Sequence, residues 1–251
     1  MTQIIYGRHP VLAALRQPDT PLEEIIVAEG AGGKWLHEVR RDARAAGVRL
    51  RLAERAVLDR LCGTPNHQGI LARRGSYAYR SEGELLDDVT ALHEPALLVA
   101  ADSLTDPMNL GNLCRSALAA GAHGLVIPKD RAAGVSPTVA KAAAGALEYL
   151  TVYRVTNLAD CLGRLKDAGL AIIGAAADAP LSLYATDLTQ PLVLVIGSED
   201  KGMRPRVAKQ CDLVASIPMA APEIGSLNAA ASGAVALFEA RRQRLMAIKK
   251  I

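Results

Sequence analysis

The feature that most constrains the fold is a set of short apolar runs that alternate with helical patterns. Residues 96–101 and 192–196 consist only of Ala, Val, Leu and Ile, and each run ends at a polar loop. Runs of this length without polar alternation are typical of strands buried on both faces of a parallel sheet. The sequence therefore predicts an α/β fold, in which ligands bind at loops beyond the carboxyl ends of the strands.

Composition agrees with this fold class. Half of the 251 residues are hydrophobic but only 3% are aromatic, so aliphatic side chains must fill the core. The four cysteines have no C-x-x-C spacing, and we expect free thiols in a reducing compartment and no metal site. The N-terminus lacks a signal-peptide pattern, and no apolar run approaches the roughly 18 residues of a membrane helix. We therefore expect a cytoplasmic protein with no membrane partner.

Two domains are expected. Residues 1–75 carry the strand and helix patterns of a small α/β domain, and residues 76–95 turn polar and irregular, as in a linker that leads into a short helix. Strands and helices alternate again over residues 96–251. The second domain is the larger one and contains both apolar runs.

The net charge of +3 is too small to identify a nucleic-acid-binding protein by itself. Basic residues gather in two places, between residues 40 and 60 and in the tail at Arg241, Arg242, Arg244, Lys249 and Lys250. Either cluster could contact phosphates, and either could be a solvated helix face. The sequence does not support a common nucleotide-binding loop. No G-x-G-x-x-G follows the first strand of either domain, and the Gly-rich turn before Lys34 lacks the Walker A pattern.

Three polar clusters lie at strand ends or helix starts. In the first, residues 106–115, Asn109 can cap a helix and Arg115 follows about two turns later with a fixed positive charge. The second is the glycine loop 197–203, in which glycine lets a ligand approach the backbone and Glu199 can accept a hydrogen bond. The third, residues 217–228, ends in Ser226, Leu227 and Asn228. Taken singly, each could be an ordinary cap, loop or surface ion pair.

Together the clusters, in this order and at these distances, resemble the three signature motifs of the SpoU (TrmH-like) branch of the SPOUT RNA methyltransferases. The motifs read Asp-Pro-x-Asn-x-Gly-x-x-x-Arg, Gly-Ser-Glu-x-x-Gly, and Ile-Pro-Met followed by Ser-Leu-Asn, within residues 96–240. Residues 5–9 and 67–70 are similar to segments of the family's small substrate-binding domain. The resemblance thus extends over most of the chain.

The resemblance implies a fold and a set of site residues. The C-terminal domain would be closed by a deep trefoil knot, an exception to the un-knotted rule, would bind S-adenosyl-L-methionine, and would form a homodimer with the active sites close to the interface. The cofactor-binding residues would be Gly197, Ile217, Met219 and Leu227. The catalytic residues around the reacting ribose would be Arg115, Glu199, Ser226 and Asn228, with Asn109 supporting Arg115.

The implied reaction is 2′-O-methylation of a guanosine ribose in 23S rRNA, in the P loop of the peptidyl-transferase region. The alternatives are a tRNA ribose 2′-O-methyltransferase, a non-catalytic RNA-binding or ribosome-assembly protein of the same fold, and another α/β enzyme with a small cofactor. Arginine is proposed as the base in this family, but its guanidinium normally stays protonated. Our hypothesis is that Arg115 stabilises the developing alkoxide and grips a phosphate.

Overall fold

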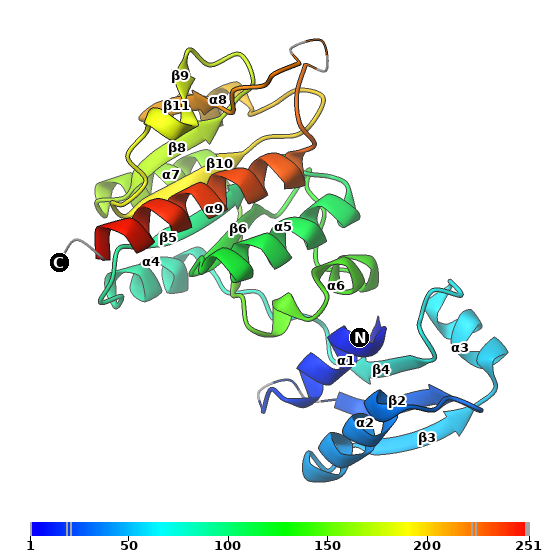
Figure 1. Ribbon diagram of the computed structural model, residues 1–251. Coiled ribbons are helices and arrows are strands. Elements are labelled where there is room, and N and C mark those ends of the chain that lie inside the picture. Colours follow the sequence, from blue (N-terminus) through cyan, green and yellow to red (C-terminus); the bar gives the residue numbers. More distant parts are fainter. Residues whose placement is uncertain (1, 19, 21, 222, 224, 249–251) are drawn as a thin grey trace. The chain divides into compact units, whose positions relative to one another are not determined.

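The computed structural model describes residues 2–18, 20, 22–221, 223 and 225–248, and the chain divides into two compact units (Figure 1). The first unit comprises Met1–Ala78 and Val135–Tyr149, and the second comprises Tyr79–Gly134 and Leu150–Ile251. Lys249 and Lys250 of the basic tail lie outside the described residues. Within the described ranges, no helix has both the length and the apolar character needed to cross a membrane.

The first unit is built on a four-stranded sheet in the order β1-β4-β2-β3. Its strands are β1 (Gln3–Tyr6), β2 (Leu22–Ala28), β3 (Arg49–Ala53) and β4 (Ile70–Arg74), and its first three helices are α1 (Arg8–Leu15), α2 (Lys34–Ala45) and α3 (Arg55–Cys62). Strand β4 is antiparallel to β1 and β2, whereas β2 and β3 are parallel. The prediction of an α/β unit here is confirmed, but β1 was not predicted, because four residues are too few to show a period.

The first unit also contains a segment from the middle of the sequence. Helix α6 (Pro137–Ala143) and the 3-10 helix η1 (Ala146–Glu148) both belong to it, and α6 contacts β1. Ser136 caps α6, since its hydroxyl accepts a hydrogen bond from the Val139 N–H at 3.3 Å and Pro137 stands at the first helical position. The assignment of residues 1–75 to a substrate-binding domain, and of residues 76–95 to a linker, stays a prediction.

A buried ion pair holds this segment in the first unit. Arg74 Nη1 donates to Glu148 Oε1 at 2.7 Å, and the two side chains are only 5% and 4% exposed. The Thr20 hydroxyl donates to the other carboxylate oxygen of Glu148 at 3.0 Å. Arg74 Nε and Nη2 are buried without a hydrogen-bond acceptor among the described residues. The pair therefore joins β4 to η1 at a considerable desolvation cost.

The second unit contains a seven-stranded sheet in the order β7-β6-β5-β10-β8-β11-β9, and all neighbouring strands are parallel. The strands are β5 (Leu97–Ala101), β6 (Gly124–Pro128), β7 (Val152–Val155), β8 (Ala171–Ala175), β9 (Leu181–Ser182), β10 (Leu192–Ile196) and β11 (Leu213–Ser216). Every residue of β5, β6 and β10 is buried. The predicted parallel sheet is confirmed, and its central strands coincide with the apolar runs.

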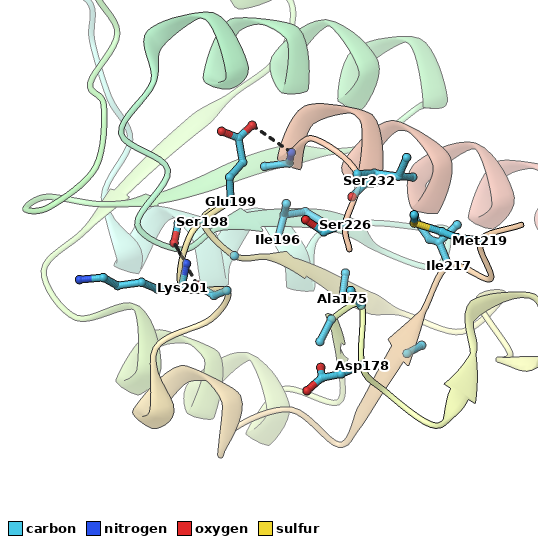
Figure 2. A pocket seen from close by; sticks show the side chains of 17 residues that line it. Ala175, Asp178, Ile196, Ser198, Glu199, Lys201, Ile217, Met219, Ser226 and Ser232 are labelled. Atoms are coloured by element: carbon cyan, nitrogen blue, oxygen red, sulfur yellow. Dashed lines mark hydrogen bonds between the residues drawn. The ribbon is translucent and has the colours of Figure 1, made fainter. Parts of the chain in front are cut away.

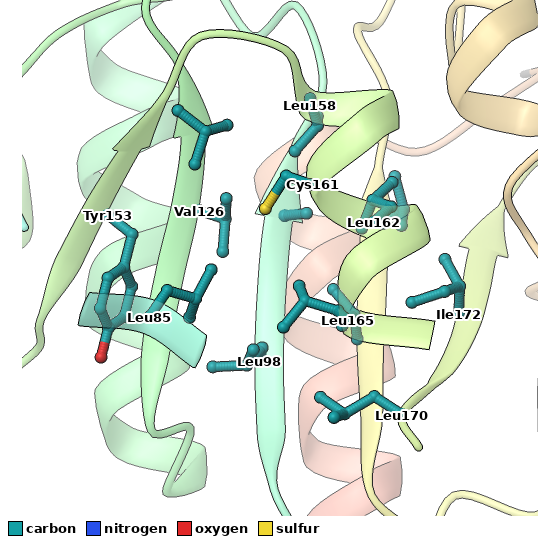
Figure 3. Packing of buried hydrophobic residues seen from close by; sticks show 14 of the residues in the cluster. Leu85, Leu98, Val126, Tyr153, Leu158, Cys161, Leu162, Leu165, Leu170 and Ile172 are labelled. Carbon is teal, nitrogen blue, oxygen red and sulfur yellow. The ribbon is translucent and has the colours of Figure 1, made fainter. Parts of the chain in front are cut away.

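Helices cover both faces of this sheet. They are α4 (Glu82–Thr90), α5 (Pro107–Ala120), α7 (Leu158–Asp167), the 3-10 helix η2 (Leu183–Ala185), α8 (Pro205–Ala208) and α9 (Ala229–Ile248). On one face, Leu85 of α4 and Leu162 of α7 pack against Leu98 and Val126 (Figure 3). The stretch 76–95 thus supplies a completely buried side chain to the core of the second unit.

On the other face, α9 packs against α5. Gly233 of α9 makes this approach close, because a Cβ at this position would collide with Leu113 of α5. Both helices begin at the carboxyl ends of the strands, and their first residues therefore face the predicted site.

Candidate active site

A cavity of about 280 Å³ lies at the carboxyl ends of β8, β10 and β11 (Figure 2). Its walls come from the end of β8, the glycine loop after β10, the segment after β11 and the start of α9. The predicted site residues among those that line it are Gly197, Glu199, Ile217, Met219, Ser226 and Leu227. The structure thus brings together all four predicted cofactor-binding residues and two of the predicted catalytic residues.

The glycine loop is a tight hairpin. The backbone of Ser198 and Gly202 exchanges two hydrogen bonds, at 2.9 and 3.1 Å. Gly197, just before this bridge, lies so close to the backbone of Gly202 and Met203 that a Cβ would overlap it. Only glycine fits at residue 197 without displacing main chain. The hairpin therefore presents its backbone directly to the cavity.

A hydrogen-bonded network fixes Glu199 beside the start of α9. Asn109 Nδ2 donates to Glu199 Oε1 at 2.7 Å. Asn228 Nδ2 donates to the same oxygen and also to Asn109 Oδ1, the latter at 2.9 Å, and the Ala229 N–H donates to Glu199 at 3.3 Å. Asn109 is only 6% exposed. Residues of the first and third clusters thus hold the carboxylate of the second cluster in place.

The two asparagines have different roles in their helices. Asn228 caps α9, since its Oδ1 accepts from the Ala230 and Ala231 N–H groups at 2.9 and 3.2 Å. Asn109 does not cap α5, contrary to the prediction. Asp106 does so by accepting from the Met108 N–H at 2.9 Å, because the helix already begins at Pro107.

Arg115 lies apart from the other predicted residues. It is exposed on α5 and is not among the residues that line the cavity. Within the described part of the chain it has no hydrogen-bond or ion-pair partner. Asn109, which was expected to support Arg115, is hydrogen-bonded instead to Glu199 and Asn228. The guanidinium is therefore left available to a group outside this polypeptide.

Sequence reasoning missed a buried clamp behind the glycine loop. The side chain of Asp102, which is completely buried, accepts hydrogen bonds from Arg204 N at 2.7 Å and Arg204 Nε at 2.6 Å. It joins the end of β5 to the residues that follow the hairpin. The only signal in the sequence was an acidic residue directly after an apolar run, and a residue in that position also fits an ordinary strand end.

Cysteine and metal chemistry are not supported by the described residues. Burial raises the pKa of the Cys114 and Cys161 thiols to about 12, so these groups are uncharged and poor nucleophiles. All four cysteines are free. Among the described residues, no three His, Cys, Asp or Glu side chains are grouped to hold a metal ion.

The two parts of the chain match two protein-family models. The SpoU rRNA Methylase family matches residues 96–238, and the family of RNA 2′-O ribose methyltransferase substrate-binding domains matches residues 4–80. The chain belongs to the SpoU rRNA methylase family. The second match covers most of the contiguous N-terminal part of the first unit.

Individual relatives extend the match over nearly the whole chain. The chain is 42% identical to the 23S rRNA (guanosine-2′-O-)-methyltransferase RlmB of Nitrosomonas europaea, over 96% of this chain and 92% of that one. It is 39% identical to RlmB of Escherichia coli, over 97% and 100%. The SpoU methyltransferase AviRb of Streptomyces viridochromogenes, crystallised in complex with AdoMet, has a TM-score of 0.81 at 28% identity, over 98% and 91%.

Proposed function

We propose that this protein is an S-adenosyl-L-methionine-dependent enzyme that methylates the ribose 2′-oxygen of a guanosine in 23S rRNA. The observation that carries the proposal is the similarity to two RlmB proteins over almost the full length of each chain. The P loop of the peptidyl-transferase region is the proposed target within that RNA. Such a substrate would place the enzyme in the cytoplasm, where bacterial ribosomes are assembled.

The cavity suits the proposed cofactor. Apolar side chains of Ile196, Ile217 and Leu227 can cover an adenine ring, while the Asp178 and Glu199 carboxylates can oppose the positive charges of the cofactor (Figure 2). The backbone of Gly197 is accessible to hydrogen-bonding groups because nothing projects from its Cα. When bound, the cofactor supplies an electrophilic sulfonium methyl group.

Gly197→Ala should weaken S-adenosyl-L-methionine binding by about 10- to 100-fold, because the added Cβ displaces the Gly202 and Met203 backbone and restoring the original hairpin around the cofactor would cost about 1–3 kcal/mol. Isothermal titration calorimetry with the purified full-length protein measures this change. Gly83→Ala is the matched control, because a Cβ at residue 83 would meet no atom within 4 Å. Equal affinity of the Gly197 variant and the wild type would contradict the proposed backbone contact.

The chain's own residues account for orientation and charge in the proposed reaction. The network of Asn109, Glu199 and Asn228 provides a rigid polar wall against which a ribose can be oriented. Arg115 supplies a permanent positive charge that can stabilise the alkoxide as the 2′-hydroxyl loses its proton. The acceptor of that proton stays unassigned. Positioning and electrostatics are therefore the proposed sources of rate enhancement.

We further propose that the enzyme is a homodimer and that the second unit is knotted, as the family resemblance implies. Helices α5 and α9 expose large apolar side chains, with Met108 at 48%, Phe238 at 49% and Met246 at 55% exposure. A second copy that covers these helices would remove that surface from water. It would also lie near Arg115, which is on α5.

The proposed function is tested by mapping ribose methylation in RNA from cells that lack the protein. We expect one guanosine methyl group of 23S rRNA to disappear, and to return with the wild-type gene but not with Arg115→Ala. If a tRNA methyl group disappears instead, the enzyme is a tRNA 2′-O-methyltransferase. If no ribose methyl group is lost from either RNA, the protein is a non-catalytic relative.

A further inference from the structure

Two cationic side chains from distant parts of the sequence lie in one region of the first unit, around Gly7. Arg8 begins α1, and Lys141 comes from α6, far along the chain. Lys141 Nζ lies against Gly7, so closely that a Cβ at Gly7 would collide with it, and 5.9 Å from the centre of the Tyr6 ring. Gly7, with φ of +98°, therefore both forms the turn into α1 and makes room for the ammonium group.

Neither cation is neutralised within the described part of the chain. The Arg8 guanidinium is exposed and stacks on Trp35, 4.5 Å from the ring centre, and Lys141 is partly buried. Neither side chain has a carboxylate partner among the described residues. Burial, and then repulsion by Arg8, lowers the pKa of Lys141. The two positive charges thus repel each other, and water solvates the partly buried Lys141 ammonium group incompletely.

Several other arginines of the same unit are paired, whereas the exposed Arg44 and Arg49 have no ion pair among the described residues. Arg16 contacts Asp42 at 3.0 Å, Arg51 contacts Glu24 at 2.9 Å, and Arg74 contacts Glu148 at 2.7 Å. Lys141 differs from the exposed, unpaired arginines because it is partly buried beside Gly7 and Tyr6 and still has no counter-charge among the described residues. An anion from outside the chain would supply that counter-charge.

The loop beside the two cations is held in a fixed conformation. Gln68 has φ of +58°, a left-handed conformation that is costly for this residue, and its Oε1 accepts from the Arg8 N–H at 3.0 Å. The preceding His67 is completely buried, with Nδ1 accepting from the Gly69 N–H at 3.0 Å and Nε2 2.8 Å from Asp59. The start of α1 is thus anchored before any ligand arrives.

We propose that Arg8 and Lys141 together bind one phosphate of the RNA substrate. This inference rests on the proposed function, and it adds a residue that lies outside the matched substrate-binding segment 4–80. A phosphate suits the pair, since the planar guanidinium can donate two parallel hydrogen bonds and the ammonium adds a point charge. An RNA backbone is favoured over an acidic peptide because Arg8 belongs to a segment matched to RNA-methyltransferase substrate-binding domains.

The test compares two double variants of the full-length protein in filter binding to in vitro transcribed 23S rRNA. Arg8→Gln/Lys141→Met should weaken binding by about 10-fold at low salt and reduce the slope of log Kd against log salt by about one. Methionine at 141 retains the aliphatic contact with Tyr6 and Gly7. Arg206→Gln/Lys209→Met removes the same charge from exposed residues of the second unit that lie in neither basic cluster, and it should change Kd less than about 3-fold.

Further measurements separate the possible failures. S-adenosyl-L-methionine affinity and thermal melting should match the wild type in both variants, and Arg8→Lys/Lys141→Arg should restore most of the RNA affinity. If the wild type methylates rRNA and the two double variants bind it equally well, the phosphate site is wrong and the proposed function stands. If the wild type neither binds nor methylates rRNA, both are wrong. If the wild type binds rRNA without methylating it, and Arg8→Gln/Lys141→Met binds rRNA more weakly, the phosphate site is supported and the proposed function is not.

Discussion

Replacing Arg115 with alanine should lower the rate of methyl transfer by about 100- to 1000-fold, the effect of removing one donor that stabilises a developing oxyanion. Arg115 has no hydrogen-bond or ion-pair partner among the described residues, so its loss should not weaken the fold or the cofactor cavity. Single-turnover assays with labelled S-adenosyl-L-methionine measure the rate, and calorimetry should give an unchanged cofactor affinity. Arg206→Ala, on a side chain that is 80% exposed, is the control.

Arg115→Lys distinguishes two roles for this residue. Lysine retains the charge but loses the planar guanidinium, so we expect activity well below that of the wild type. Near-full activity would show that the guanidinium is not required. If residue 115 acted as the base, the lysine variant would gain rate as the pH approached about 10, where lysine deprotonates. A pH–rate profile without that rise agrees with charge stabilisation.

Arg74→Met should lower the free energy of unfolding of the first unit by about 3–5 kcal/mol, because it leaves the Glu148 carboxylate buried without its cationic partner. Trp35 is the only tryptophan of the chain and belongs to this unit, so its fluorescence during urea denaturation reports the effect directly. Arg51→Met, which breaks a more exposed pair, is the control and should cost less than about 1 kcal/mol.

The double variant Arg74→Met/Glu148→Met completes this test. Two donors of Arg74 are already buried without an acceptor among the described residues, so the wild-type pair is costly. An apolar pair should therefore restore most of the stability that the single variant loses. A double variant as unstable as Arg74→Met would show that shape, not charge, determines the contact between β4 and η1.

Much of the second unit could be predicted because its strands are buried on both faces and leave uninterrupted apolar runs, such as residues 192–196. The polar clusters after these runs could be predicted to meet, since parallel strands bring their carboxyl ends to one edge. The pairing of Asp102 with Arg204 could not, because it joins residues far apart in sequence that show no common pattern. Nor could hydrophobic periodicity indicate that Arg115 has no partner among the described residues.

The first unit illustrates a different limit. Residues 137–148 show an ordinary helical pattern, and neighbouring positions belong to the second sheet, so nothing local indicated that the segment packs against β1. The packing of this segment in the first unit depends on single residues, namely Glu148, Lys141 and Gly7, and their contacts join positions that are far apart in the sequence. Strand β1 was missed for a similar reason, since its pairing with β4 is determined by a partner that is distant in sequence.

The discontinuous first unit limits how members of this family can be recombined. A chimera that exchanged only the first 78 residues would combine one parent's Arg74 and Arg8 with the other parent's Glu148 and Lys141. The N-terminal and C-terminal parts of the chain therefore cannot be exchanged independently, and a functional chimera needs junctions near residues 78, 134 and 149. Covariation between these distant positions is the trace that such a constraint would leave in natural sequences.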